Sequence, residues 1–191
     1  MTCRLVALGS SWGGFEAVAN VLRSFSSHTG AAVVIAQHRA PGRSTLAGLL
    51  SSHTGWLVGE VEDKEPIVPG RAYLAPGGYH LLVEEGRLSL STEGPVSFSR
   101  PSIDVLFESA AAAYGPDSVG VILTGSNRDG AAGLAAIAAR GGSVAVQDPN
   151  SAQRSAMPLA ALAAVPGSLV LALAEIGPWL SRLCPPASAV A

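Results

Sequence analysis

Ser11, His38 and Asp129 are the residues of this 191-residue chain whose types and positions best suit nucleophilic chemistry. Each comes shortly after an apolar run that is typical of a buried β-strand. In open α/β sheets, catalytic groups gather beyond the carboxyl ends of the parallel strands. A serine hydroxyl needs a base to take its proton, and an imidazole base needs a carboxylate to hold its tautomer. Placed together on one rim of the sheet, these three side chains predict nucleophilic acyl transfer.

Each of these residues also has a simpler structural explanation. A serine after a strand commonly serves the turn itself, and a loop histidine commonly caps a backbone group. Asp129 has the right position to be the N-cap of a helix over Ala131–Arg140. No one of the three residues therefore establishes a catalytic site alone.

The Gly/Ser-rich turn Gly9–Gly14 joins the first predicted strand to an amphipathic helix. Such a turn projects a small side chain above the sheet edge and aims the unpaired N–H groups of the helix start at the same point. It can hold a nucleophile beside a developing oxyanion, or it can hold a phosphate. The turn alone leaves both functions open.

The alternation of strand-like and helix-like segments predicts an α/β fold. Strands that are apolar throughout are buried on both faces, as in a parallel sheet covered by helices. Repeated strand–helix units then give a doubly wound three-layer parallel sheet of Rossmann-like type. The predicted strands are Arg4–Leu8, Ala31–Gln37, Val119–Thr124, Ser143–Gln147 and Ser168–Ala172, and the predicted helices are Gly14–Phe25, Ser44–His53, Ser102–Tyr114, Arg128–Arg140 and Pro158–Ala164.

The middle of the chain interrupts this alternation. Residues 79–91 read as two short strands joined by a turn at Glu85-Gly86, which predicts an antiparallel hairpin at one edge of the sheet. The apolar segment Ala156–Ala174 is divided by prolines and is expected to form a helix and a strand rather than a membrane span. Without a linker-like stretch, residues 1–184 are predicted to form one domain and residues 185–191 a disordered tail.

Composition excludes several classes of protein. Hydrophobic residues make up 48% of the chain and charged residues 14%, which indicates a large core. A formal net charge of −2 gives no electrostatic case for nucleic acid as a partner. Cys3 and Cys184 stand at opposite ends without metal-ligand spacing, which argues against a disulfide or a zinc site. A protein of the reducing cytoplasm is therefore expected.

Several motifs occur in order along the chain: Leu8–Gly14 (LGSSWGG), Ala36–His38 with Pro41-Gly42, Tyr73–Gly77 with His80, Arg100–Phe107 (RPSIDVLF), Gly120–Gly125 and Asp129–Gly133. With these motifs the chain, from about Leu5 to about Ala174, resembles the catalytic domain of the CheB-type chemotaxis receptor methylesterases. This resemblance implies a hydrolase that removes methyl esters from receptor glutamates, releases methanol and also deamidates receptor glutamines. The implied partners are the cytoplasmic helices of methyl-accepting chemotaxis receptors, with a separate response regulator as a further candidate.

The resemblance also implies roles for individual residues. Ser11 matches the nucleophile, His38 the base and Asp129 the carboxylate that orients the base. The oxyanion and substrate-binding candidates are Trp12, Gly13, Ser126 and Arg100, and no cofactor or metal is implied. The receiver domain that commonly precedes this catalytic domain is not expected within this sequence.

Two departures from the family pattern keep an alternative open. Trp12 stands where the family has a small hydroxyl residue, and Ser126–Arg128 replaces the family's usual Met-Gly-Asn. A degenerate relative that binds a receptor or partner protein with little catalysis is therefore the second hypothesis. A nucleotide-binding Rossmann-like protein is the third, but the first turn lacks GxGxxG spacing.

Overall fold

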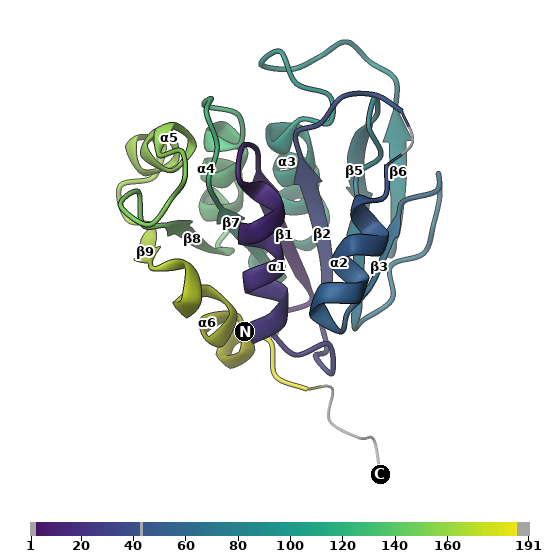
Figure 1. Ribbon diagram of the computed structural model, residues 1–191, viewed down its shortest axis with the longest axis horizontal. Helices are drawn as coiled ribbons and strands as arrows, with labels where there is room; N and C mark the ends of the chain where they lie inside the picture. The colour runs from purple at the N-terminus through teal and green to yellow at the C-terminus, as the bar shows by residue number, and fades with distance from the viewer. Residues whose placement is uncertain (1–2, 43, 187–191) are drawn as a thin grey trace.

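The computed structural model describes residues 3–42 and 44–186 and centres on a seven-stranded parallel sheet (Figure 1). The strand order is β3-β4-β2-β1-β7-β8-β9, and every neighbouring pair is parallel. This arrangement confirms the doubly wound fold. The bounds are β1 Leu5–Ser10, β2 Ala32–Gln37, β3 Leu57–Glu60, β4 Arg71–Leu74, β7 Ser118–Ile122, β8 Ser143–Gln147 and β9 Leu169–Leu171.

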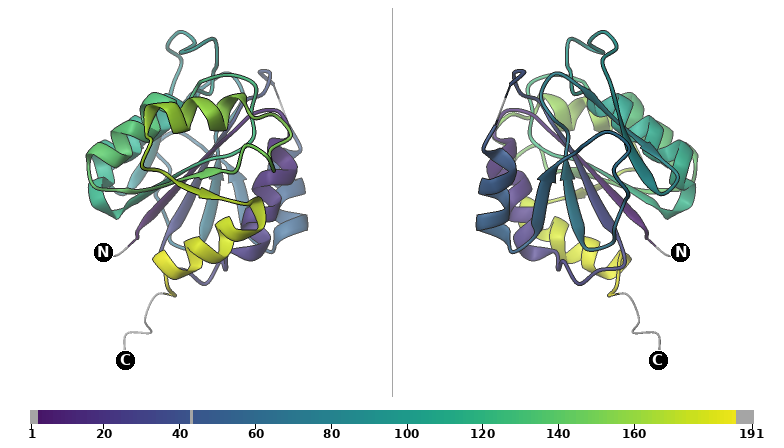
Figure 2. Two further views of the ribbon diagram at one scale, coloured as in Figure 1. Left: turned by 90° about the vertical axis from the view of Figure 1, so that its left-hand side faces the viewer. Right: turned by 90° about the vertical axis from the view of Figure 1, so that its right-hand side faces the viewer.

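Helices cover both faces of the sheet (Figures 1 and 2). One face packs against α1, α2 and α6, and the other against α3, α4 and α5. Within the described ranges, no helix is both long and apolar enough to cross a membrane. The bounds are α1 Gly14–Ser24, α2 Leu46–Thr54, α3 Ile103–Tyr114, α4 Ala131–Ala139, α5 Ala156–Ala164 and α6 Leu173–Leu183, with a 3₁₀ turn, η1, at Gly115–Asp117.

The central strand β1 shows why the sheet has two cores. Its side chains alternate across the sheet, so Val6 and Leu8 join the core under α1 and α6, whereas Leu5 and Ala7 join the core under α3. All four side chains are fully buried. A strand that is apolar at every position is stable only when both faces are covered, and this layering provides that cover.

The predicted antiparallel hairpin forms a sheet of its own. Its strands are β5 His80–Glu84 and β6 Arg87–Ser91, joined by a turn at Glu85-Gly86. The hairpin pairs with itself rather than extending the parallel sheet. Leu81, Val83 and Leu88 pack into the α3 side of the core. In Figure 1 the hairpin lies on the same side of the molecule as β3. The sequence therefore predicted the hairpin, but not that it forms a separate two-stranded sheet.

The C-terminal part departs from the sequence prediction in two ways. Ala156–Ala174 forms α5 and β9 as expected, but α6 follows, which was not predicted. The ordered chain also continues past the predicted boundary at residue 184. The carbonyl of Pro185 accepts a hydrogen bond from Gly30 N at 3.0 Å, and Pro186 forms an antiparallel bridge with Thr29. The rest of the predicted disordered tail, 187–191, lies outside the described residues.

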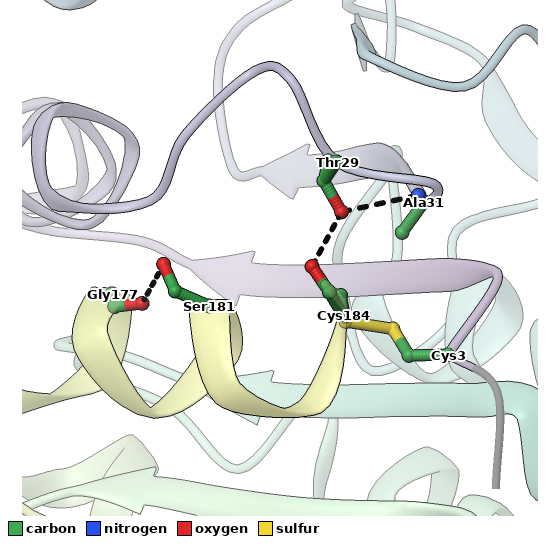
Figure 3. Close-up of a disulfide and its surroundings, with 6 residues drawn as sticks. All are labelled: Cys3, Thr29, Ala31, Gly177, Ser181 and Cys184. Carbon is green, nitrogen blue, oxygen red and sulfur yellow. Dashed lines mark hydrogen bonds between the residues drawn. A yellow bond between two sulfur atoms is a disulfide. The ribbon is translucent and has the colours of Figure 1, made fainter. Parts of the chain in front are cut away.

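A disulfide joins Cys3 to Cys184, so the prediction against a disulfide was wrong (Figure 3). The two residues are 181 positions apart, but α6 ends beside the start of β1, and their Cα atoms lie 4.9 Å apart. Thr29 Oγ1 also donates to the carbonyl of Cys184 at 2.8 Å. The two ends of the domain are therefore held together at the amino end of β1.

The strand order creates a topological switch point between β1 and β7. From β1 the chain goes to β2 on one side of the sheet and returns later to β7 on the other. The connections that leave β1 and β7 therefore diverge, and such a point is where open α/β sheets form their crevices. Ser11 follows β1, His38 follows β2 and Asp129 follows β7.

Candidate active site

The nucleophile candidate, Ser11, lies in a tight turn between β1 and α1. Ser11 N donates to the carbonyl of Thr124 at 2.9 Å, and Gly14 N donates to the carbonyl of Ser11 at 2.9 Å. Gly13 has a φ of +76°, which favours glycine, and a Cβ there would lie 2.7 Å from the side-chain oxygen of Gln153. The turn is therefore compressed, and Ser11 stands directly at the start of α1.

The side chains of His38 and Asp129 are in direct contact. Nε2 of His38 lies 2.6 Å from Oδ2 of Asp129, and His38 N donates to the carbonyl of Ser10 at 3.1 Å. A carboxylate only accepts hydrogen bonds, so Nε2 carries the proton in the neutral ring and Nδ1 is left as the basic nitrogen. The imidazole is thus oriented with one nitrogen toward the acid and the other available to act as a base.

Asp129 is completely buried, and the amino end of α3 holds it. Besides His38, its donors are the Ser102 hydroxyl at 2.8 Å, Ile103 N at 2.7 Å and Asp104 N at 3.0 Å. Burial alone would raise the pKa of this carboxyl, but the hydrogen bonds outweigh it and lower the pKa. Asp129 therefore stays ionised and stabilises an imidazolium at His38.

Asp129 does not cap its own helix. The N-cap of α4 is Gly130, with a φ of +95° and no side-chain cap. The carboxylate instead caps α3, whose N-cap residue is Ser102. The interpretation of Asp129 as the cap of the following helix was therefore wrong, because the chain turns at Gly130 and directs the side chain toward α3.

The free face of His38 meets two polar side chains that sequence reasoning missed. Nδ1 lies 3.5 Å from Ser99 Oγ and 3.5 Å from Asn127 Nδ2. The Asn127 side chain is held in place because its amide oxygen, Oδ1, accepts a hydrogen bond from Asp129 N at 3.2 Å. In the described part of the chain no hydrogen bond joins the Ser11 hydroxyl to His38. In unliganded active sites the hydrogen bond between a nucleophile and its base is often not formed until substrate binds.

Trp12 and Gly13 lie in the turn just before α1, with Gly13 at its N-cap position. Neither amide donates to a backbone carbonyl among the described residues. The carbonyl of Trp12 accepts from the Thr124 hydroxyl at 3.0 Å, and its indole is 63% exposed, with the Arg154 guanidinium 5.6 Å from the ring centre. The Trp12 side chain is therefore exposed at the surface, and its backbone N–H has no backbone acceptor within the described ranges.

The other two substrate-binding candidates lie differently. Ser126 is exposed, and no hydrogen bond connects it to His38 or Asp129 within the described ranges. Arg100 donates to the carbonyls of Thr92 and Glu93, both at 2.9 Å, so part of its guanidinium holds the loop after β6. Arg100 also lines a cavity of about 480 Å³ that opens beside His38.

That cavity is the open space next to the base. Arg39 forms one wall and is held by an ion pair with Glu60 at 2.7 Å. Ser99 and Phe98 form another wall of the cavity, and the Phe98 ring is fully exposed at the mouth of the cavity. The space therefore suits a side chain presented from the surface of a larger partner.

Fold and site together define a doubly wound α/β protein whose switch point carries the residue types for ester hydrolysis. The family model described as CheB methylesterase matches residues 6–180. Over 185 residues, 40% are identical to a putative protein-glutamate methylesterase/protein-glutamine glutaminase of Leptospira interrogans, covering 96% of each chain. The crystal structure of the Thermotoga maritima CheB methylesterase catalytic domain superposes with a TM-score of 0.89 at 30% identity, covering 96% of this chain and 100% of that one. This chain belongs to the CheB methylesterase family.

Other relatives are longer than this chain. The protein-glutamate methylesterase FrzG of Myxococcus xanthus is 43% identical over 180 residues, which cover 93% of this chain but 54% of that protein. A Paramagnetospirillum magneticum protein-glutamate methylesterase/protein-glutamine glutaminase is 39% identical, with 94% of this chain and 49% of that protein covered. The chain thus spans nearly all of the Leptospira protein and about half of these two.

Proposed function

We propose that this chain hydrolyses methyl esters of glutamate side chains on the cytoplasmic helices of chemotaxis receptors and also deamidates receptor glutamines. The observation that carries the proposal is the 2.6 Å bond between His38 and a fully buried Asp129, at the switch point next to the Ser11 turn. The names of the relatives in Leptospira and Myxococcus support the same substrate chemistry.

In the proposed mechanism Ser11 Oγ attacks the ester carbonyl while Nδ1 of His38 takes the hydroxyl proton. The negative charge that develops on the carbonyl oxygen is stabilised by the Trp12 N–H and the adjoining start of α1. The imidazolium is stabilised by Asp129 and then gives its proton to the departing methoxide, which leaves as methanol. Water, activated by the same nitrogen, releases the glutamate carboxylate and restores Ser11.

A glutamine substrate follows the same path, except that ammonia takes the place of methanol. The site would receive either side chain through the cavity beside His38. We place the reaction in the cytoplasm because the proposed substrate side chains lie on the cytoplasmic helices of the receptor, and not because of the cysteines, since Cys3 and Cys184 are paired. A receptor helix bundle is the docking partner, and a separate response regulator is a candidate activator.

The competing hypothesis is a partner-binding domain without catalysis, suggested by Trp12 and Ser126–Arg128. The geometry favours the enzyme, because the Trp12 indole and Ser126 are both exposed and neither takes part in the contact between His38 and Asp129. Asn127, the middle residue of the altered segment, accepts a hydrogen bond from Asp129 N through its side-chain oxygen and does not block the Asp129 side chain. The altered residues therefore change the rim and leave the buried pair intact.

Methanol release from a methylated receptor tests the proposal. Replacing Ser11 or His38 by alanine should lower turnover by about 10⁴- to 10⁶-fold, since either change removes the nucleophile–base pair. The matched control is Ser52→Ala, an exposed serine in α2, which should leave turnover unchanged. Receptor capture without methanol release from the unaltered chain would support the binding hypothesis instead.

A further inference from the structure

Helices α3 and α4 exchange carboxylates at their amino ends. Asp129, just before α4, accepts the amides of Ile103 and Asp104 at the start of α3. Asp104, in the first turn of α3, uses Oδ1 to accept Gly130 N at 2.9 Å and Gly133 N at 2.8 Å at the start of α4. Each helix start is thus neutralised by an acid from the other, and one of the two acids is the proposed catalytic one.

The two helix starts are in direct contact. A Cβ on Gly133 would lie 2.6 Å from Cβ of Phe107 and 2.9 Å from the carbonyl oxygen of Asp104. A Cβ on Gly130 would lie 2.6 Å from Cγ2 of Ile103. At Gly133 the backbone of α3 lies directly against α4, and at Gly130 the Ile103 side chain fills the space, so a shift of one helix start moves the other.

The amide of Gly130 belongs to the peptide unit that follows Asp129. Holding this amide fixes the plane of that peptide, and therefore the direction in which the Asp129 side chain leaves the backbone. We propose that Asp104 is a positioning residue for the catalytic acid, holding the Asp129–Gly130 peptide so that Asp129 meets His38. The proposal rests on the proposed function, because it assigns Asp104 a part in the same triad.

The surroundings of Asp104 show which substitution would remove its charge and keep its hydrogen-bond acceptor in place. Burial raises the pKa of Asp104, and the nearby charge of Asp129 adds to the rise, although the amides of Gly133 and Gly130 oppose it. Asp104 also borders a cavity of about 350 Å³ lined by Ser97 and Arg128. A neutral asparagine keeps the accepting oxygen, and the cavity leaves room for its amide group.

The test compares Asp104→Asn with Asp104→Ala in the full chain. Alanine removes the acceptor, and kcat for methanol release should fall about 10- to 100-fold with KM within about threefold, as expected when a residue that orients a catalytic group is lost. Asparagine should keep kcat within about threefold of the unaltered chain. The control is Glu175→Ala, which removes the side-chain acceptor for Ala172 N at the start of α6, away from the site, and should leave kcat unchanged.

A second readout needs neither substrate nor activity. The hydrogen-bonded Nε2 proton of His38 should give a far-downfield proton resonance in the unaltered chain and in Asp104→Asn, and circular dichroism should show both folded. Folded Asp104→Ala should lose or shift this resonance. An unchanged resonance and unchanged kcat in Asp104→Ala would overturn the inference, as would an Asp104→Asn chain as slow as the alanine variant.

The two proposals fail in different ways. If the unaltered chain releases no methanol, the proposed function fails, but the His38 resonance still reports whether Asp104 positions Asp129. If the unaltered chain is active and the Asp104 variants match it in both readouts, only the role of Asp104 is rejected.

Discussion

At the scale of single residues, the site depends on a buried carboxylate that is kept charged by its neighbours. Asp129 accepts hydrogen bonds from His38, the Ser102 hydroxyl and two amides of α3. Such a group stabilises the fold only while it is ionised, so its contribution depends on pH. The same interactions that orient the base should therefore appear in the acid stability of the protein.

The sign of this effect follows from the lowered pKa of Asp129. Its folded-state pKa lies below the ordinary value of 3.8, so the stabilising contribution is fully present above that value and is lost as pH falls through the folded pKa. Asp129→Asn should therefore be less stable than the unaltered chain at neutral pH, and the difference should shrink in acid. Urea unfolding at pH 7, 5 and 3 measures it. A difference that grows toward acid pH would contradict the assignment.

Sequence reasoning proposed Ser11, His38 and Asp129 as site residues, but it did not identify the side chains that contact His38 and Asp129. The three residues follow strands, so a parallel sheet predicts their shared rim. Asp104 lies in the first turn of α3, and only the packing of α3 on α4 brings it to the start of α4 beside Asp129. Asn127, by contrast, lies two residues before Asp129 on the same connection and contacts its amide locally. The role of Asp104 depends on a tertiary contact that no local spacing encodes.

At the scale of the elements, the strand–turn–helix unit from β1 to α1 sets the position of Ser11, the proposed nucleophile. Gly13 in this unit combines a positive φ with close contact to Gln153, and Gly14 lies against Ser10 Oγ, 2.6 Å from where its Cβ would be. The turn thus has little freedom to accept a side chain. Helix α1 therefore starts at one defined residue, which fixes the positions of its first amides, and an oxyanion site requires donors in fixed positions.

Gly13→Ala should lower both stability and turnover. A side chain in the left-handed region costs about 1–2 kcal/mol, and relaxing that strain would move the Trp12–Gly13 amides away from the substrate. The matched control is Gly48→Ala in α2, where a Cβ meets nothing within 4 Å and should stabilise the helix by about 0.5–1 kcal/mol. Thermal unfolding and methanol release measure both. Equal effects of the two substitutions would show that the turn is not constrained.

The elements themselves were largely predictable, with informative exceptions. Apolar runs such as Ala32–Gln37 are buried on both faces and were predicted as strands. Helix α6 was missed because Gly177 and Pro178 interrupt its pattern, yet Gly177 packs directly on α1, where a Cβ would lie 2.1 Å from Ser24 Oγ. Contact between the helices therefore outweighs the poor local helix propensity.

At the scale of the whole molecule, the catalytic rim and the disulfide lie at opposite ends of β1. Cys3 precedes this strand and Ser11 follows it. The disulfide closes a loop of nearly the entire domain, which no spacing rule for cysteines predicts. Stability and chemistry are therefore expected to respond separately to its loss.

Cys184→Ser should lower the free energy of unfolding by up to about 5 kcal/mol, because the unfolded chain regains the freedom of a very long loop. Turnover at 25 °C should stay within about twofold, since the site is distant. Thermal unfolding with and without reductant measures the first effect, and methanol release the second. If reductant lowers the melting temperature of Cys184→Ser as much as that of the unaltered chain, the disulfide is not the cause.

Covalent labelling of Ser11 is the most direct test of the central claim, that the buried Asp129 and His38 make this hydroxyl a nucleophile. The unaltered chain, treated with a fluorophosphonate and mapped by peptide mass spectrometry, should carry one adduct on Ser11. Ser11→Ala and His38→Ala should remain unlabelled. An unlabelled native chain, or an adduct that persists on Ser11 without His38, would contradict the account.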